Sequence, residues 1–191
     1  WIMGCAASAP QQAEDVEEDT PMQTDMPLML DDSLEFPENI PFEITWELTK
    51  KIRLEVAYEQ FHRSAEMDAK YEQRKQEVAK THDSMASHLL EELFGVKLVK
   101  NEEGKLTRDT SVELEKMTKW TANQFRYNFS EEIIHDLFWC TYHLSKPEIL
   151  AAIKQNVVDS HEVIWWVNPV KFRSVPGLYH VQILHRKKTM S

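Results

Sequence analysis

Apolar and polar positions follow a helical period over the longest uninterrupted part of the chain, residues 42–94. This stretch contains no Pro or Gly and is flanked by Pro41 and Gly95. Oppositely charged residues recur four positions apart along it, as with Glu66 and Lys70, and residues at this spacing are neighbours on a helix surface. The pattern predicts a single long helix, about 80 Å in length at 1.5 Å per residue.

The apolar positions of this predicted helix form two stripes. The first holds Leu54, Tyr58, Phe61 and Ala65, and the second holds Tyr71, Val78, Met85 and Leu89. At 100° per residue the second stripe is turned by about a third of a turn from the first. We interpret the helix as a bridge that packs on its own chain at one end and on a partner at the other.

Shorter elements are predicted between residues 95 and 158. Gly95 suits the position just past a helix end, and residues 96–108 read as a short hairpin or an exposed loop. Three short helices then begin at Thr110 (capping box with Glu113), Ser130 and Ser145 (capping box with Glu148). Short, well-capped helices joined by short loops predict a compact helical unit over residues 95–158.

The last part of the chain, residues 159–191, changes to a β pattern. Residues 163–167 and 178–184 are β-rich runs, and Pro176-Gly177 between them suits a type II turn. Because a two-stranded ribbon is marginal alone, it must lie on the helices or join a neighbour's sheet. The predicted fold class is mainly α with a small C-terminal β element (α+β).

The charge distribution separates an acidic tail from a neutral body. Residues 1–40 hold ten acids and no Lys or Arg, whereas the remaining residues hold 22 acids and 22 bases. Residues 1–41 also contain five of the eight prolines, so they are expected to form an extended tail that does not fold alone. A neutral body argues against nucleic-acid binding, which needs clustered Lys and Arg.

Several apolar residues are expected to contact protein partners. Those of the tail interrupt its acids and would dock in an apolar groove, although a solvated spacer fits them equally well. The aromatic residues near the C-terminus favour core or interface packing over base stacking. The interaction residues proposed from the sequence are Met29, Leu30, Leu34, Phe36, Leu54, Tyr58, Phe61, Trp165 and Trp166.

The sequence offers only weak candidates for residues that bind a metal or act in catalysis. On helices, Glu59 with His62 and Glu132 with His135 would place a carboxylate and an imidazole on one face, as di-iron bundles require, but the two further bridging Glu are missing. Cys140 lies near His143, yet a closed zinc site needs four ligands. The chain has only four glycines, which disfavours phosphate-cradling loops. We therefore expect no metal, no cofactor and no enzymatic activity.

The N-terminal residues raise the question of a lipid anchor. Met3-Gly4-Cys5 fits an N-myristoylation pattern with a neighbouring palmitoylatable cysteine, provided that Met3 is the initiator. Trp1 and Ile2 contradict that condition, and we expect the true N-terminus to lie outside the printed sequence. The chain has no run of 18 apolar residues, so the sequence predicts no membrane span. Peripheral membrane association is still possible.

Together these patterns predict a non-catalytic structural or interaction subunit of a large multi-protein assembly. Its partners would be other protein subunits, and no ligand is identified by the sequence. The expected setting is intracellular, with a mitochondrial respiratory or ATP-synthase type complex as the leading guess. The alternatives are a lipid-anchored adaptor or regulatory protein, which would use Gly4 and Cys5, and a helical metal-dependent enzyme.

Overall fold

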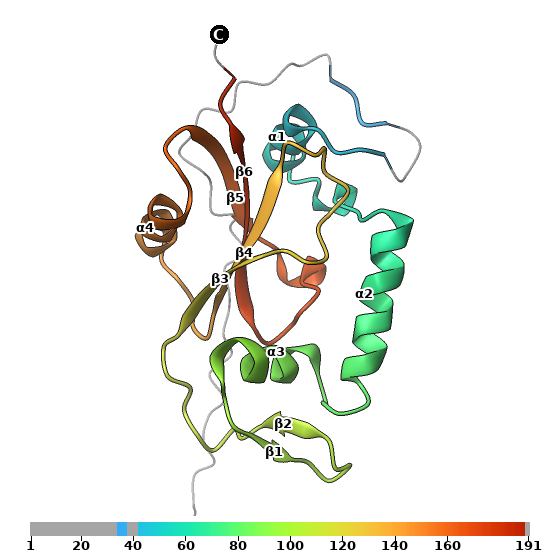
Figure 1. Cartoon of the computed structure of the whole chain (residues 1–191), viewed down its shortest axis with the longest axis vertical. Helices are drawn as coiled ribbons and strands as arrows, with labels where there is room; N and C mark the ends of the chain where they lie inside the picture. The colour runs from blue at the N-terminus through green and yellow to red at the C-terminus, as the bar shows by residue number, and fades with distance from the viewer. Residues whose placement is uncertain (1–33, 38–41, 190–191) are drawn as a thin grey trace, which may run out of the picture.

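A four-stranded antiparallel sheet forms the centre of the fold (Figure 1). The computed structural model describes residues 34–37 and 42–189. Its helices are α1 Trp46–Leu54, η1 Tyr58–Gln60, α2 Ala65–Val78, α3 Met85–Phe94, α4 Lys146–Asn156 and η2 Val170–Phe172. Its strands are β1 Leu98–Lys100, β2 Leu106–Arg108, β3 Thr118–Ala122, β4 Ile134–Cys140, β5 His161–Val167 and β6 Tyr179–Lys187.

The strands of the central sheet lie in the order β3-β4-β6-β5, and every neighbouring pair is antiparallel. Strands β4 and β5 therefore run in the same direction with β6 between them, and α4 connects them. The register pairs Leu137 with Gln182 and Gln182 with Trp166, so these three side chains share one face of the sheet. A separate two-stranded hairpin, β1 and β2, lies below α3 (Figure 1).

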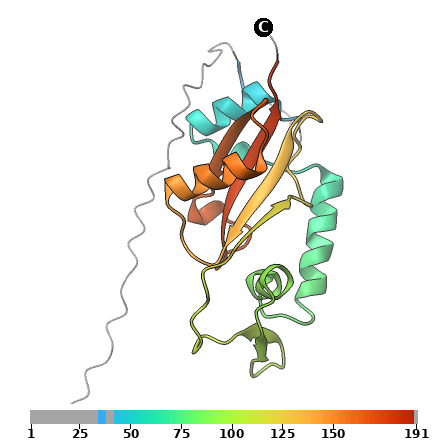
Figure 2. The ribbon, with the colours of Figure 1, turned by 60° about the vertical axis from the view of Figure 1, so that its left-hand side comes forward.

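Helix α4 lies across one face of the sheet (Figure 2). The apolar cluster on this side consists of Phe138, Cys140, Leu144, Ile149, Ala152, Ile153, Val157, Trp165, Val181 and Ile183. It joins α4 to every second residue of the three longer strands, which is the alternation expected of a pleated sheet. This face is thus filled by the protein's own core.

The opposite face carries two apolar clusters. At one end α1 packs on β5 and β6 through Ile44, Trp46, Leu48, Ile52, Tyr58, Phe129, Ile133, Ile164, Trp166 and Leu184. At the other end α3 packs on β4 through Leu90, Leu137, Trp139, Val175 and Leu178. Helix α2 runs along the side of the molecule between these two ends (Figures 1 and 2). The candidate site lies on this face of the sheet, between the two clusters.

The predicted fold class, mainly α with one long helix, three short capped helices and a small terminal ribbon, is wrong. The structure is α+β with two antiparallel sheets and six strands in the described residues. The β-rich runs near the C-terminus do form the neighbouring strands β5 and β6. They do not need another molecule's sheet on the β6 side, because β6 also pairs with β4 of the same chain.

The predicted long helix over residues 42–94 is divided into α1, η1, α2 and α3. Ser64 and Ser84 cap the N-termini of α2 and α3, since each hydroxyl accepts a hydrogen bond from a backbone N–H three residues on. A helix can therefore end without Pro or Gly when a good N-cap residue starts the next one. Each apolar stripe is divided among several elements, the first from α1 to the start of α2 and the second over α2 and α3, so neither lies on one continuous bridge.

Two of the three predicted short helices are also wrong, because the segments that begin at Thr110 and Ser130 lead into strands β3 and β4. Both faces of β4 are covered, so its apolar residues run almost continuously and lack the alternation that marks a half-buried strand. The third helix is confirmed: Ser145 and Glu148 form the predicted capping box at the start of α4. Gly95 ends α3 with φ of 66°, also as predicted.

Val56 adopts a left-handed conformation, with φ of 56°, directly after α1. The Ala57 N–H donates to the Ile52 carbonyl at 3.0 Å, the bond that a left-handed residue at a helix end allows. A β-branched side chain is strained there, and that of Val56 is exposed, so little apolar contact compensates.

We expect Val56→Gly to raise the free energy of unfolding by about 1 kcal/mol, because glycine adopts the left-handed conformation without strain. Urea denaturation monitored by circular dichroism measures this change. The matched control is Val158→Gly, at another exposed valine without positive φ, which should not stabilise the protein. A destabilised Val56→Gly variant would contradict the assignment of strain.

Candidate ligand-binding site

A cavity of about 120 Å³ lies between α2, α3 and the face of the sheet opposite α4. Its wall also includes the segment that joins β3 to β4 and residues 174–175, which precede β6. The lining mixes apolar side chains with amides, two arginines and two histidines. Leu137, Trp139 and Val175 of the cluster around α3 form part of its wall.

Strands β4 and β6 form the floor of the cavity. Leu137 and Trp139 of β4 lie opposite Gln182 and His180 of β6, so all four side chains share one face. The His180 and Trp139 rings are 4.7 Å apart. Burial lowers the pKa of His180, and its Nδ1 donates to the Leu178 carbonyl at 3.0 Å. The neutral imidazole is thus held in one orientation beside the indole.

A second buried histidine, His135, lies beside this floor on the same face of the sheet. His135 Nε2 donates to Gln182 Oε1 at 2.7 Å, and Asn123 Nδ2 lies 3.2 Å from the same nitrogen. Burial is the main cause that lowers the pKa of His135 to about 4, so its imidazole is neutral at pH 7. The hydrogen bond fixes the amide of Gln182, one of the groups lining the cavity.

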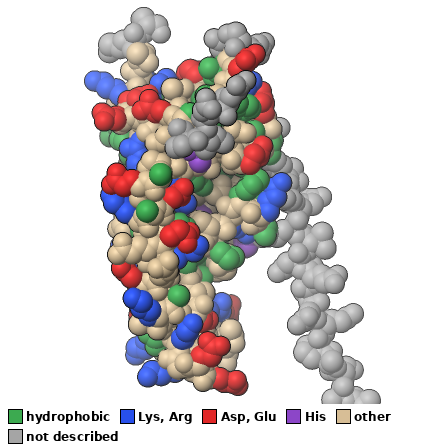
Figure 3. Space-filling model, turned by 90° about the vertical axis from the view of Figure 1, so that its right-hand side faces the viewer, with side chains coloured by type: hydrophobic (Ala, Val, Ile, Leu, Met, Phe, Trp, Pro, Cys, Tyr) green, Lys and Arg blue, Asp and Glu red, His purple; other side chains and the backbone are tan. Residues whose placement is uncertain are grey.

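Helix α2 forms the outer wall and contributes little to the apolar core. Among its residues only Val78 is buried, while Tyr71 and Arg74 are half-buried and line the cavity. The Tyr71 hydroxyl donates to the Ser174 carbonyl at 3.2 Å, and its ring lies 5.3 Å from that of Phe125. Acidic and basic side chains intermix on the outer surface of this side (Figure 3). Polar contacts rather than apolar burial therefore hold α2 over the cavity.

Arg63 lies immediately before the N-cap of α2 and borders the cavity. Its Nε donates to the Phe125 carbonyl at 2.9 Å. Its guanidinium carbon lies 4.2 Å from the centre of the Tyr71 ring and 5.5 Å from that of Tyr127. One hydrogen bond and two aromatic rings thus fix the position of this cation.

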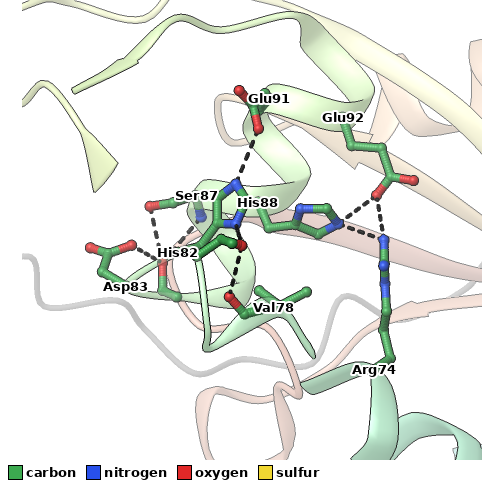
Figure 4. A network of polar contacts seen from close by, with 10 residues as sticks. Arg74, Val78, His82, Asp83, Ser87, His88, Glu91 and Glu92 are labelled. Atoms are coloured by element: carbon green, nitrogen blue, oxygen red, sulfur yellow. Dashed lines mark hydrogen bonds and ion pairs between the residues drawn. The ribbon is translucent and has the colours of Figure 1, made fainter. Parts of the chain in front are cut away.

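A network of polar contacts joins α2 to α3 at the other end of the cavity (Figure 4). Arg74 reaches from α2 to His88 Nε2 at 2.7 Å and to Glu92 Oε2 at 3.4 Å, and the His88 and Glu92 atoms are 2.9 Å apart. The His82 ring packs against that of His88 at 4.8 Å, and its Nε2 lies 3.1 Å from Glu91 Oε2. Glu92 thus balances the charge of Arg74.

Burial and the Arg74 charge both lower the pKa of His88, so the network favours its neutral form. Within residues 34–37 and 42–189, no group of three or more His, Cys, Asp or Glu side chains could hold a metal ion. The cavity instead offers hydrogen-bond donors, several aromatic faces and one cation, Arg63, whose nearest carboxylate at 3.6 Å, that of Asp68, does not line the cavity. This combination suits the binding of a small organic molecule.

Within the described part of the chain, the interaction residues proposed from the sequence do not form one surface: most are buried in or packed against the core, and one is exposed. Trp165, Trp166 and Tyr58 are buried in the chain's own apolar clusters, and Leu34, Phe36 and Phe61 pack against the cluster around α1. Leu54 is exposed. Met29 and Leu30 lie outside the described residues. The rings at these positions stabilise the domain itself, and none of the seven proposed residues that the structure describes lines the cavity.

The pairs considered for metal binding do not lie on helices in the way the spacing suggested. Glu132 is exposed in a turn, while His135 is buried within β4. His62 Nε2 contacts the Phe42 backbone, and Glu59 is exposed in η1. The i,i+3 geometry on a helix, the basis of the di-iron reading, is absent at both described pairs.

Cys140 is fully buried, and burial is the main cause that raises the pKa of its thiol to about 12. A thiol held in its neutral form is a poor nucleophile.

Gly4 and Cys5, the candidates for lipidation, lie outside the described residues. Among the helices of the described ranges, none combines the length and apolar character needed to cross a bilayer.

The cavity residues were not found from the sequence. The sequence pattern places Arg63 and Tyr71 on one long helix. It assigns residues 178–184, which supply His180 and Gln182, to a ribbon that lies on the helices or joins a neighbour's sheet. The N-cap Ser64 was the usable signal, since it would have ended the helix beside Arg63.

Comparison with known proteins gives a family and a fold. A solved structure described as "Crystal Structure of HTC1" is similar to this chain, with a TM-score of 0.53 and 20% sequence identity over 75% of this chain and 85% of that chain. At this identity the likeness shows the α+β fold alone. No curated protein matches the sequence. Residues 45–186 match the family described as "Protein of unknown function (DUF3605)". Because this match spans well over half of the chain, the chain belongs to the DUF3605 family.

Proposed function

We propose that the protein binds a small molecule in the cavity between α2 and the sheet. The observation that carries this proposal is a hollow of about 120 Å³ in which polar groups fixed by hydrogen bonds stand among apolar and aromatic side chains. A cavity that stays empty is apolar and costs stability, whereas one with polar walls holds water or a ligand. A lining that combines both kinds of group is typical of a ligand site.

The way in which α2 is attached supports the same function. Its inner face reaches the body through the hydrogen bonds of Tyr71 and Arg74 and through one ring contact, between Tyr71 and Phe125. Elements with little buried apolar area open at low free-energy cost, so α2 can admit a ligand without disturbing the sheet. We propose binding rather than turnover, because the buried histidines of the floor are already committed to structural hydrogen bonds.

Blocking the cavity is the test of this function. Leu89 lies on α3 and lines the cavity, whereas Leu150 is an exposed residue of α4 on the opposite side of the sheet. Single-ring compounds, both neutral and charged, would be screened by saturation-transfer NMR against the full chain. We expect Leu89→Trp to abolish binding of the compounds that bind the wild type, and the matched Leu150→Trp variant to retain it.

Thermal melts of both variants establish that each is folded before the screen. A set of compounds that binds all three proteins alike, or a wild type that binds none of them, would contradict the proposed function.

The interaction subunit predicted from the sequence remains a second proposal. Its support is that Leu34 and Phe36, from the acidic segment, pack against the apolar cluster around α1, as expected of a segment that docks on apolar surfaces. Two other reasons for it, the long helix and the unpaired ribbon, no longer apply. Size-exclusion chromatography with light scattering tests it: concentration-dependent association supports the proposal, and a monomer at all concentrations opposes self-assembly.

A further inference from the structure

We infer that the ligand of this cavity is a single-ring organic carboxylate and that Arg63 binds its carboxylate group. The inference rests on the proposed function and specifies the chemical class of the ligand. It is drawn from the geometry of Arg63, from the charges around the cavity and from the cavity's size.

The donors of Arg63 are incompletely used. Its Nε is bonded to the Phe125 carbonyl, but among the described residues neither terminal nitrogen has a hydrogen bond within 3.5 Å. The nearest carboxylate is Asp68, whose Oδ1 lies 3.6 Å from NH1 and whose side chain is 56% exposed. Because Asp68 is largely exposed and the distance is long, this ion pair contributes little. The guanidinium therefore keeps donors for a carboxylate, the group whose shape matches its fork.

The position of the cation is set before any ligand arrives. The Arg63 side chain is only 15% exposed, and the rings of Tyr71 and Tyr127 lie beside its guanidinium. A cation already held in place loses little conformational entropy when it binds an anion. Partial burial also strengthens its attraction for a negative charge relative to an arginine in water.

Among the residues that line the cavity, Arg63 is the one cation whose nearest carboxylate, that of Asp68, lies outside the lining. Arg74 lies against Glu92, and the buried His180 is neutral because burial lowers its pKa. The floor supplies the Gln182 amide, and further amides come from the segment after β3. An anionic ligand would thus meet one fixed cation and neutral donors, which favours a carboxylate over a neutral or cationic ligand.

The apolar part of the ligand is limited by the available space. An engineered cavity of about 150 Å³ accommodates benzene, so a space of about 120 Å³ is too small for a fused system and limits the apolar part of the ligand to one ring. Phe125, Trp139 and Tyr71 line this space, and aromatic side chains favour a planar ring through stacked or edge-on contacts.

Titration calorimetry with matched acid and amide pairs tests the inference. The probes are benzoate with benzamide and phenylacetate with phenylacetamide, each titrated into the full chain. We expect the wild type to bind an acid roughly 10- to 100-fold more tightly than its amide, because a charged hydrogen-bond pair is lost with the amide. Arg63→Gln should remove this preference.

The matched control is Lys70→Gln, which removes one positive charge from an exposed position of α2 that does not line the cavity. It should keep the preference for the acid, and thermal melts should show both variants folded. Equal affinity for acids and amides, or an unchanged preference in Arg63→Gln, would overturn the carboxylate assignment. Neither would affect the proposed function, because the Leu89→Trp screen uses neutral compounds as well.

Discussion

Trp166→Ala is expected to lower the free energy of unfolding by about 3–5 kcal/mol, the range for truncating a buried tryptophan. The Trp166 side chain is fully buried, and its ring stacks on Phe61 with centroids 4.7 Å apart. Its indole N–H donates to Asn168 Oδ1 at 2.7 Å, and the Arg53 guanidinium lies 5.7 Å from the ring. Truncation would leave a cavity and remove the partner of a buried amide.

This loss is a large share of the 5–15 kcal/mol that stabilises a typical domain. Urea denaturation at pH 7.5 measures it against two controls. Val158→Ala alters an exposed side chain and should change the stability by less than about 0.5 kcal/mol. Trp166→Phe keeps a ring beside Phe61 and should lie between the wild type and Trp166→Ala. A loss below about 1 kcal/mol for Trp166→Ala would contradict its position in the core around α1.

Acidification is expected to destabilise the protein through His135. Burial lowers its pKa from 6.5 to about 4, so below pH 6.5 the unfolded chain takes up a proton that the folded protein does not. The neutral histidine therefore favours folding fully above pH 6.5, and this contribution is lost as the pH falls toward 4. The shift corresponds to about 3 kcal/mol. The lowered pKa values of His88 and His180 act in the same direction.

Comparison of the wild type with His135→Gln separates this contribution from the others. The variant removes the titrating group and keeps an amide that can donate to Gln182. The unfolding free energy of both proteins should fall between pH 7.5 and pH 4. The fall should be about 3 kcal/mol smaller for the variant than for the wild type. Parallel curves for the two proteins would show that His135 is not the buried neutral group described.

The elements that sequence reasoning identified are those specified by local signals. Ser145 and Glu148 cap α4 through contacts that span only three residues, and Gly95 ends α3 because it tolerates φ of 66°. Gly177 in the turn before β6 similarly has φ of 89°. Such signals depend on nearby backbone atoms, so they keep their meaning when the rest of the fold is unknown.

Strands β3 and β4 depend instead on distant parts of the chain. The apolar run of β4 is compatible with either a buried helix or a strand covered on both faces, and only its pairing with β6, some 40 residues later, decides. Apolar stripes likewise do not reveal whether two segments share one helix. Ser64 and Ser84 mark the breaks, but serine also occurs within helices, so neither is decisive alone.

The candidate site was beyond local reasoning for a related physical reason. Arg63, Tyr71 and His88 come from three consecutive segments, while His180 and Gln182 follow about a hundred residues later. None of these residues forms a motif with fixed spacing. Their proximity results from the sheet register and from the contacts that hold α2 over it.

The most direct test of the central claim, that a small carboxylate binds between α2 and the sheet, is a crystal structure of the chain with phenylacetate. We expect the carboxylate within hydrogen-bond distance of the Arg63 terminal nitrogens, with the ring directed toward Trp139 and Phe125. Phenylacetate bound elsewhere, or a cavity that stays empty at saturating concentration, would contradict it.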